Sequence, residues 1–195
     1  AQAYADLMIP LLPEGVLQII HGDGTQGKAL VNADVDLIAF TGSRATGAHI
    51  LESAGGGLKR VILELGGKDP LIVLDDANLE AAAKFAAMNS FRNAGQVCVS
   101  TERIYVQEPI AEQFQQLLCE AATAMPVGDG CEEGIEIGPM IDGGQKHHVE
   151  QQVEKAVTDG AEVLYRGADL GGNFFPLTVL GNCEESMDVI REETF

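Results

Sequence analysis

The stretch "LIAFTGSRATGAHI" (37–50) indicates the fold class, because it passes from an apolar strand through a Gly-Ser turn into a probable helix. Similar apolar runs alternate with stretches of helix length along most of the chain. The expected strands lie at 16–20, 37–41, 60–65, 70–74 and 103–106, and the expected helices at 25–33, 43–54, 78–93, 109–125 and 145–159. Short, continuous strands rich in Val, Ile and Leu suit a parallel sheet that is covered on both faces. The sequence therefore predicts an α/β fold with a doubly wound parallel sheet, followed after 161 by short strands joined by Gly turns.

Composition narrows the classes of function. Of the 195 residues 46% are apolar, but no run approaches the roughly 18 apolar residues of a membrane span. Twelve basic against thirty acidic residues give a net charge of −18, which excludes nucleic acid and anionic membrane surfaces as expected partners. Four cysteines without C-x-x-C spacing favour a reducing compartment. We expect a soluble, cytoplasmic protein.

Both ends of the sequence begin or stop inside apparent structure. The first residues read as part of a helix, and "MDVIREETF" (187–195) stops without a turn signal or a polar tail. We therefore expect the chain to be a piece of a longer protein.

The Gly-Ser turn in the opening stretch is a candidate phosphate site. Ser43 can cap the helix that follows, and Gly42 allows the backbone to approach a ligand closely. A pyrophosphate would fit against the free N–H groups of the first helical turn. The stretch lacks the G-x-G-x-x-G fingerprint, so an ordinary strand–helix connection remains the alternative.

The stretch "VILELGGKDP" (61–70) places a carboxylate at the end of an apolar strand. Burial of an unpaired carboxylate is costly and raises its pKa, which would make Glu64 a general base. The alternative is that the strand simply ends at Glu64, which then points into water, while Gly66 and Gly67 form a turn.

The stretch "FRNAGQVCVSTER" (91–103) contains Cys98 among small and polar residues. A nucleophilic thiol needs a helix N-terminus, a cation or a base nearby, and no histidine is close in sequence. A small core thiol is the alternative, although Gly95, Gln96, Ser100 and Thr101 make surroundings more polar than a core usually offers.

Taken together and in this order, five segments resemble the aldehyde dehydrogenase superfamily. They are "FTGSRATG" (40–47), "LELGGKDP" (63–70), "NAGQVCVS" (93–100), "IGPMID" (137–142) and "EETF" (192–195). The resemblance implies an enzyme in which Cys98 attacks an aldehyde carbonyl, the thiohemiacetal becomes a thioester, and Glu64 activates the water that hydrolyses it. It also implies that the backbone N–H of Cys98 helps to hold the oxyanion.

The resemblance further implies NAD or NADP as the cofactor and a small-molecule aldehyde as the substrate. Residues 1–66 would be part of a Rossmann-like NAD(P)-binding domain and 67–195 part of a catalytic domain, both incomplete. The implied cofactor-binding residues are Gly27 near the adenine, Gly42, Ser43 and Gly47 near the pyrophosphate, and Leu65, Glu193 and Phe195 near the nicotinamide and its ribose. Because Glu193 and Phe195 end the chain, we expect them to fray.

Family members are longer than this chain, and their additional segments contribute to the oxyanion hole and to pairing of subunits. The resemblance therefore implies a homo-oligomer in the full-length protein and little or no activity in the 195-residue piece alone. Two alternatives stay open: a related enzyme that transfers the acyl group to coenzyme A, which would not need Glu64, and a non-catalytic fragment of the fold. We expect no metal site, since the adjacent His147 and His148 point about 100° apart on a polar helix.

Overall fold

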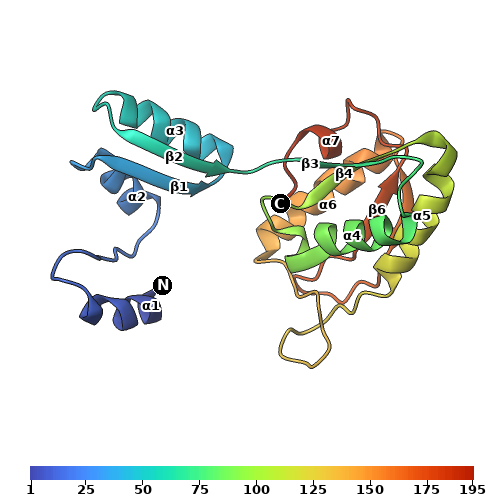
Figure 1. The fold of residues 1–195 in the computed structure, drawn as a ribbon, viewed down its shortest axis with the longest axis horizontal. Helices are drawn as coiled ribbons and strands as arrows, with labels where there is room; N and C mark the ends of the chain where they lie inside the picture. The colour runs from blue at the N-terminus through green and yellow to red at the C-terminus, as the bar shows by residue number, and fades with distance from the viewer. The chain divides into compact units, whose positions relative to one another are not determined.

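A computed structural model describes residues 1–195, and the contacts within the chain divide it after Leu65 into unit 1 (residues 1–65) and unit 2 (residues 66–195) (Figure 1). This division falls one residue before the predicted domain boundary; the assignment of the two parts to cofactor and catalytic domains stays a prediction. None of the helices has the length and apolar character needed to cross a membrane.

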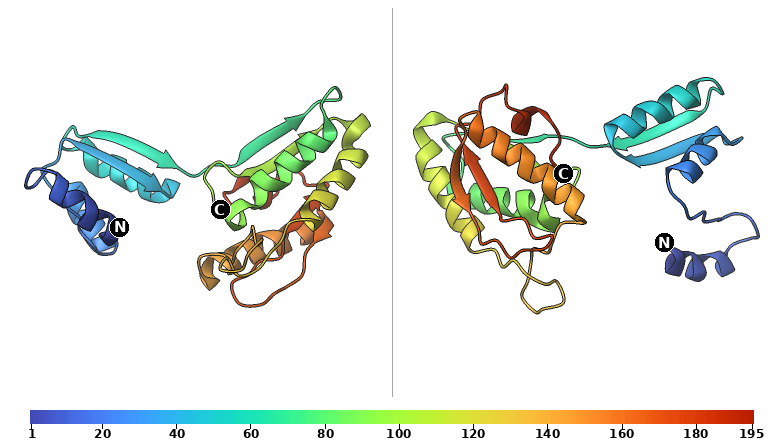
Figure 2. Two further views of the ribbon diagram at one scale, coloured as in Figure 1. Left: turned by 60° about the horizontal axis from the view of Figure 1, so that its bottom comes forward. Right: turned by 180° about the vertical axis from the view of Figure 1, so that it is seen from behind.

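Unit 1 is built around a strand–helix–strand motif. Its elements are α1 (Gln2–Met8), η1 (Ile9–Leu11), α2 (Gly24–Asn32), β1 (Leu37–Gly42), α3 (Arg44–Gly55) and β2 (Arg60–Leu65). The two strands pair in parallel, from Leu37 opposite Arg60 to Gly42 opposite Leu65, and α3 packs against both (Figure 2). A parallel pair needs a crossover of about a dozen residues, which the 12-residue α3 supplies.

The predicted strand at 16–20 is wrong. These residues adopt no regular structure, and Val16 and Ile20 are largely exposed. An apolar run becomes a strand only when a neighbouring strand pairs with it, and β1 and β2 pair only with each other.

Unit 2 contains a parallel pair of strands and an antiparallel pair. Its elements are β3 (Asp69–Val73), α4 (Leu79–Phe91), η2 (Arg92–Gly95), β4 (Thr101–Val106), α5 (Glu108–Thr123), α6 (Gly143–Thr158), β5 (Glu162–Arg166), β6 (Thr178–Gly181) and α7 (Asp188–Arg191). β3 and β4 are parallel and are joined through α4, whereas β5 and β6 are antiparallel. The short helix α7 lies where only strands and turns were expected.

The main core of unit 2 lies between α4 and α5. Three buried alanines of α4 meet Phe114 and Leu118, which are spaced by one turn on α5, and Val73 of β3 completes the cluster. Alanines at the contact let the two helices approach closely. A smaller cluster joins Met140 to Val149 and Val153 of α6, and Ala94 packs against it.

The chain thus has the predicted α/β architecture, with parallel strands joined through helices. The helices of this chain cover only part of the strand faces. Alternate side chains of the strands remain open, with Ile62 51% exposed and Ile72 67% exposed. Each parallel sheet has only two strands, so the helices of the chain cover part of its surface and leave the rest in contact with solvent.

Candidate active site

Cys98 lies on an exposed turn between η2 and β4. The backbone that leads into this turn is left-handed at three successive residues: Asn93 (φ 53°), Ala94 (φ 56°) and Gly95 (φ 78°). Gly and Asn adopt this conformation readily, but for Ala it costs roughly 1–2 kcal/mol. Packing of Ala94 against Met140 and its neighbours offsets that cost. Strain of this kind is held in place only by well-packed surroundings.

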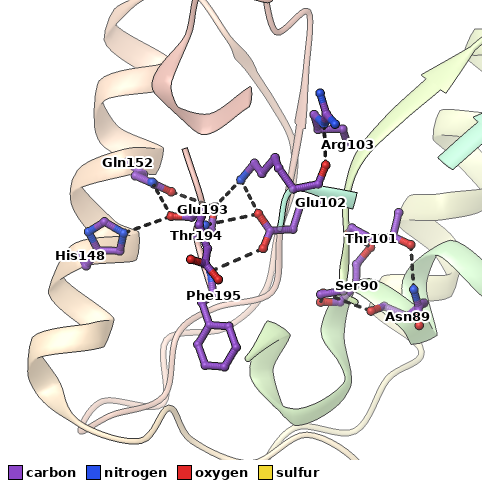
Figure 3. Close-up of polar contacts among 12 residues, drawn as sticks. Asn89, Ser90, Thr101, Glu102, Arg103, His148, Gln152, Glu193, Thr194 and Phe195 are labelled. Atoms are coloured by element: carbon purple, nitrogen blue, oxygen red, sulfur yellow. Dashed lines mark hydrogen bonds and ion pairs between the residues drawn. The ribbon is translucent and has the colours of Figure 1, made fainter. Parts of the chain in front are cut away.

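Side chains fasten the base of the Cys98 turn to the end of α4 (Figure 3). The buried Ser100 hydroxyl lies 3.2 Å from the carbonyl oxygens of both Asn89 and Ser90, to which it can donate. Ser90 Oγ donates to the Thr101 carbonyl at 2.7 Å, and Asn89 Nδ2 donates to Thr101 Oγ1 at 2.8 Å. The turn is therefore anchored on its C-terminal side while Cys98 itself stays exposed.

Gln96 connects the turn to the segment 137–142. Its Nε2 donates to the Asn93 carbonyl at 3.0 Å, and its Oε1 accepts the Ile141 N–H at 2.9 Å. Asn93 Nδ2 in turn donates to the Gln96 carbonyl at 3.0 Å. The "IGPMID" segment thus buttresses the N-terminal side of the turn.

The backbone N–H of Cys98 donates no hydrogen bond within the chain. The residue itself is exposed. That this N–H holds the oxyanion of an adduct on the thiol stays a prediction.

Gly66 and Gly67 do not form the left-handed turn that would need glycine. A Cβ at Gly67 would lie 3.3 Å from the Cys98 carbonyl oxygen and 2.8 Å from Asp69 Oδ1, and a Cβ at Gly66 would overlap the Glu193 carboxylate. Glycine is needed at these positions because Cys98 and Glu193 come so close. The strand ends at Leu65, as the alternative expected, although residues 66–68 form no hydrogen-bonded turn. The "GGK", "VCVS" and "EETF" segments come together here.

The segment Glu193–Phe195 is held by side chains of unit 2, contrary to the expected fraying. Thr194 N–H donates to Glu102 Oε2 at 3.3 Å (Figure 3). Gln145 Nε2 donates to the carbonyls of Thr194 at 2.8 Å and Phe195 at 2.6 Å. Lys68 Nζ donates to Thr194 Oγ1 at 2.6 Å and pairs with Glu102.

The Glu193 carboxyl has a pKa above its usual value. Burial raises this pKa most, and the nearby negative charge of Glu102 raises it further. The positive charge of Lys68 and the backbone N–H of Gly67 act in the opposite direction. The Glu193 carboxyl is thus partly buried and lies in a fixed position beside Gly66.

The remaining predicted residues lie in unit 1. Ser43 caps α3 and accepts the Thr46 N–H at 3.2 Å, and Gly42 ends β1 immediately before it. Glu64 is exposed in β2 opposite Thr41, so the expected burial of its carboxylate is wrong. Gly27 is exposed within α2, with open space around it.

Gly47 has a visible packing role in unit 1. It is buried in α3, and a Cβ there would lie 2.6 Å from the Leu65 side chain. The absence of a side chain lets α3 lie close to the end of β2. Contact of Gly47 or Leu65 with a cofactor stays a prediction.

The other cysteines differ from Cys98 in their surroundings. Burial raises the pKa of the Cys119 and Cys183 thiols, and both are partly buried. Cys131 is exposed in a loop rich in acidic residues. Of the two exposed cysteines, only Cys98 lies on a turn anchored from both sides.

A cavity of about 440 Å³ lies within unit 2. Its lining includes Lys68, Glu102, Thr194 and Phe195, but not Cys98. The cavity therefore borders the side chains that hold the Glu193–Phe195 segment and does not contain the exposed thiol.

Comparison with known proteins agrees with this geometry. The model of the aldehyde dehydrogenase family matches residues 1–195, the whole chain. The chain belongs to the aldehyde dehydrogenase family. Among curated relatives, it is 40% identical to a glutarate-semialdehyde dehydrogenase of Pseudomonas putida, over 94% of this chain and 39% of the relative. It is also 40% identical to the NADP+ succinate-semialdehyde dehydrogenase of Escherichia coli, over 100% of this chain and 42% of the relative.

Solved structures of aldehyde dehydrogenases share the fold of this family member. An NADP-dependent enzyme of E. coli matches with a TM-score of 0.95 and 38% identity, over 98% of this chain and 41% of that chain. The betaine aldehyde dehydrogenase of Staphylococcus aureus in complex with NAD+ matches with a TM-score of 0.91 and 34% identity, over 97% of this chain and 39% of that chain. This aldehyde dehydrogenase chain thus spans about two fifths of the length of these proteins.

Sequence reasoning missed the side chains that hold the family's "EETF" segment in place. These are Lys68, Glu102, Gln145 and Gln152. Two signals pointed to them: Lys68 directly follows the glycine pair, and Glu102 is a charged residue at the start of an apolar strand. A buried charge requires a partner, but the sequence does not name that partner.

Proposed function

We propose that Cys98 is the nucleophile of an enzyme that oxidises a small-molecule aldehyde to a carboxylic acid with NAD+ or NADP+. The observation that carries this proposal is an exposed thiol on a doubly anchored turn, with a free backbone N–H and with Gly67 and Glu193 beside the same turn. Family membership supports the reaction class.

The residues of the chain perform the chemistry on Cys98. The thiolate adds to the aldehyde carbon, and the Cys98 N–H donates a hydrogen bond to the oxygen on which negative charge develops. NAD(P)+, when bound, supplies the acceptor for the hydride that leaves the aldehyde carbon. The carbon is then oxidised to the level of an acid and remains bound to Cys98 as a thioester.

Hydrolysis of the thioester requires a base, and Glu64 is the proposed one. Glu64 accepts a proton from water, the resulting hydroxide attacks the thioester carbon, and the Cys98 thiolate leaves as the acid is released. Only Leu65 and Gly66 separate Glu64 in the chain from Gly67, whose backbone lies against the Cys98 carbonyl. The exposure of Glu64 in β2 leaves its carboxylate open to water.

The residues of unit 1 fit the phosphates of a nicotinamide nucleotide. The N–H groups of Arg44 and Ala45, in the first turn of α3, donate no hydrogen bond within the chain, and both residues are exposed. They follow Gly42 and Ser43 at the end of a parallel strand, where N–H groups and the helix dipole favour an anion. The NADP+ in the name of the E. coli relative and the NAD+ bound to the S. aureus enzyme support this cofactor class.

The experiment uses the protein that carries this chain. Cys98→Ala should abolish aldehyde-dependent formation of NAD(P)H, while Cys131→Ala, at the other exposed cysteine, should leave turnover unchanged. Glu64→Gln should still form the thioester but hydrolyse it slowly, so mass spectrometry should find an acyl group on Cys98. Normal turnover in Cys98→Ala would contradict the proposal.

Two further measurements separate the alternatives. Release of free acid without coenzyme A would exclude acyl transfer to that thiol. Absence of both nucleotide binding and acylation of Cys98 would favour a non-catalytic fragment. Assembly into a homo-oligomer stays a prediction that size-exclusion chromatography with light scattering can test.

A further inference from the structure

We propose that Lys68 and Glu102 are positioning residues that fix the Glu193 carboxylate for the nucleotide by clamping Thr194. The proposal rests on the proposed function and on the expectation, from the family resemblance, that Glu193 lies beside the nicotinamide ribose. It concerns how the chain holds Glu193, which no sequence motif showed.

The clamp begins with an ion pair that is almost removed from solvent. The side chains of Lys68 and Glu102 are only 10% and 12% exposed, and they pair with each other. Lys68 immediately precedes β3, and its backbone carbonyl accepts a hydrogen bond from Arg103 Nε at 2.8 Å. Both charges therefore sit on the rigid β3–β4 pair.

Both members of the ion pair form a hydrogen bond with Thr194. Lys68 Nζ donates to Thr194 Oγ1 at 2.6 Å, while Glu102 Oε2 accepts the Thr194 N–H at 3.3 Å. The other carboxylate oxygen of Glu102 accepts the Phe195 N–H at 3.5 Å. One ion pair thus fixes both the side chain and the backbone of the residue that follows Glu193 (Figure 3).

Helix α6 completes the clamp from the opposite side. Thr194 Oγ1 donates to Gln152 Oε1 at 2.8 Å, and Gln152 Nε2 donates to the Glu193 carbonyl at 3.1 Å. Gln152 is itself 8% exposed. The segment Glu193–Phe195 makes no backbone–backbone hydrogen bond, so side chains, with Gln145 among them, hold its main chain.

The consequence is a defined direction for the Glu193 side chain. Its carboxylate lies against Gly66, and the next residue, Gly67, lies beside the carbonyl of Cys98. A carboxylate that binds a sugar hydroxyl is effective only when its position is fixed, since a displacement of about 1 Å can cost about a hundredfold in rate.

Stability alone does not require this ion pair. Buried ion pairs can often be replaced by uncharged residues without loss of stability, whereas removal of one partner leaves an unpaired charge and is damaging. A test must therefore remove both charges together, or leave both and remove the group that they hold.

Two variants of the protein that carries this chain meet that requirement. Thr194→Val keeps the shape and the ion pair but removes the hydroxyl that Lys68 and Gln152 bind. The double variant Lys68→Met with Glu102→Gln removes both charges at once. Lys84→Met, at an exposed lysine of α4 that makes no ion pair, is the matched control.

Three readouts decide the outcome. Amide hydrogen exchange without cofactor should be faster at Thr194 and Phe195 in both variants. The dissociation constant for NAD(P)+, measured by calorimetry, and the KM for NAD(P)+ should rise about tenfold, equivalent to about 1.4 kcal/mol. The KM for the aldehyde and the rate of alkylation of Cys98 should stay unchanged, as should every value in Lys84→Met.

The failures of the two proposals are distinguishable. Unchanged exchange at Thr194, or faster exchange with unchanged nucleotide affinity, overturns the clamp while aldehyde oxidation stands. A fall in kcat with both KM values unchanged indicates a structural role and also overturns it. If the unaltered protein oxidises no aldehyde, the proposed function fails, and nucleotide affinity in the variants still decides whether the clamp positions Glu193.

Discussion

Two loops of unit 2 expose a cysteine, and they are built differently. The Cys98 turn is tied to α4 by Ser100 and to the segment 137–142 by Gln96. The loop 129–136 carries Cys131, and its bonds at that residue are local: Cys131 N–H donates to Asp129 Oδ1 at 2.9 Å. Both cysteines are exposed, but only the backbone around Cys98 is held by side chains that connect it to other elements.

The difference shows what the sequence of a reactive turn must supply. Polar residues around Cys98 do not solvate it; they bind the backbone on both sides and leave the thiol and its own N–H free. The acidic residues around Cys131 make no such connections to other elements. A polar neighbourhood therefore indicates a site only when its side chains bond to the scaffold.

The largest effect is expected when one glycine beside each cysteine is replaced by alanine: Gly67 beside Cys98 and Gly130 beside Cys131. In Gly67→Ala the new Cβ would lie 3.3 Å from the Cys98 carbonyl and 2.8 Å from Asp69 Oδ1, so the Asp69 side chain must move and the Cys98 carbonyl must give way slightly. We expect turnover of the aldehyde to fall about tenfold. Gly130→Ala, in the Cys131 loop, meets no atom within 4 Å and should leave turnover unchanged. Equal activities in steady-state assays would show that the Cys98 backbone does not depend on Gly67.

A smaller effect is expected from the anchor of the turn. Ser100→Ala removes the hydroxyl shared between the Asn89 and Ser90 carbonyls in a residue that is 3% exposed. The free energy of unfolding should fall by about 1 kcal/mol, the usual net worth of such a bond. Asp129→Ala, which removes the exposed bond to Cys131, should change it by less than about 0.5 kcal/mol. Urea titrations of both variants measure the two values, and a larger loss in Asp129→Ala would reverse the comparison.

Local periodicity predicted the regular elements well. The strand at 60–65 matches β2 at both ends, and the ends of the other predicted elements between residues 25 and 159 lie within two residues of those observed, whereas α7 was not predicted. The run at 16–20 failed because strand formation depends on a partner strand, which periodicity does not reveal. Gly66 and Gly67 were open to reading as a turn, yet they are glycines because Glu193 and Cys98, distant in sequence, come close to them.

The clamp around Thr194 lay beyond sequence reasoning for the same reason. Lys68 and Thr194 are 126 positions apart, and the main-chain groups of the segment bond only to side chains from other elements. Helix propensity depends on a few neighbouring residues. It therefore predicts that α6 forms, but not which of its glutamines binds the segment Glu193–Phe195. The family resemblance named Cys98, Glu64 and Glu193, and the structure adds the residues that hold Glu193.

The smallest expected effect concerns the charge of Glu193. Burial and Glu102 raise its pKa in the folded chain above the ordinary value of 4.5. A carboxyl with a raised pKa contributes stability that is complete below about pH 4.5 and is lost as the pH rises through the folded value. Glu193→Gln cannot ionise and escapes this loss. Its unfolding free energy, measured in urea at a series of pH values, should therefore rise relative to the unaltered chain as the pH increases above about 4.5. The acid end of each series is the internal control, and a difference that stays constant with pH would mean that Glu193 is not packed against Glu102 in solution.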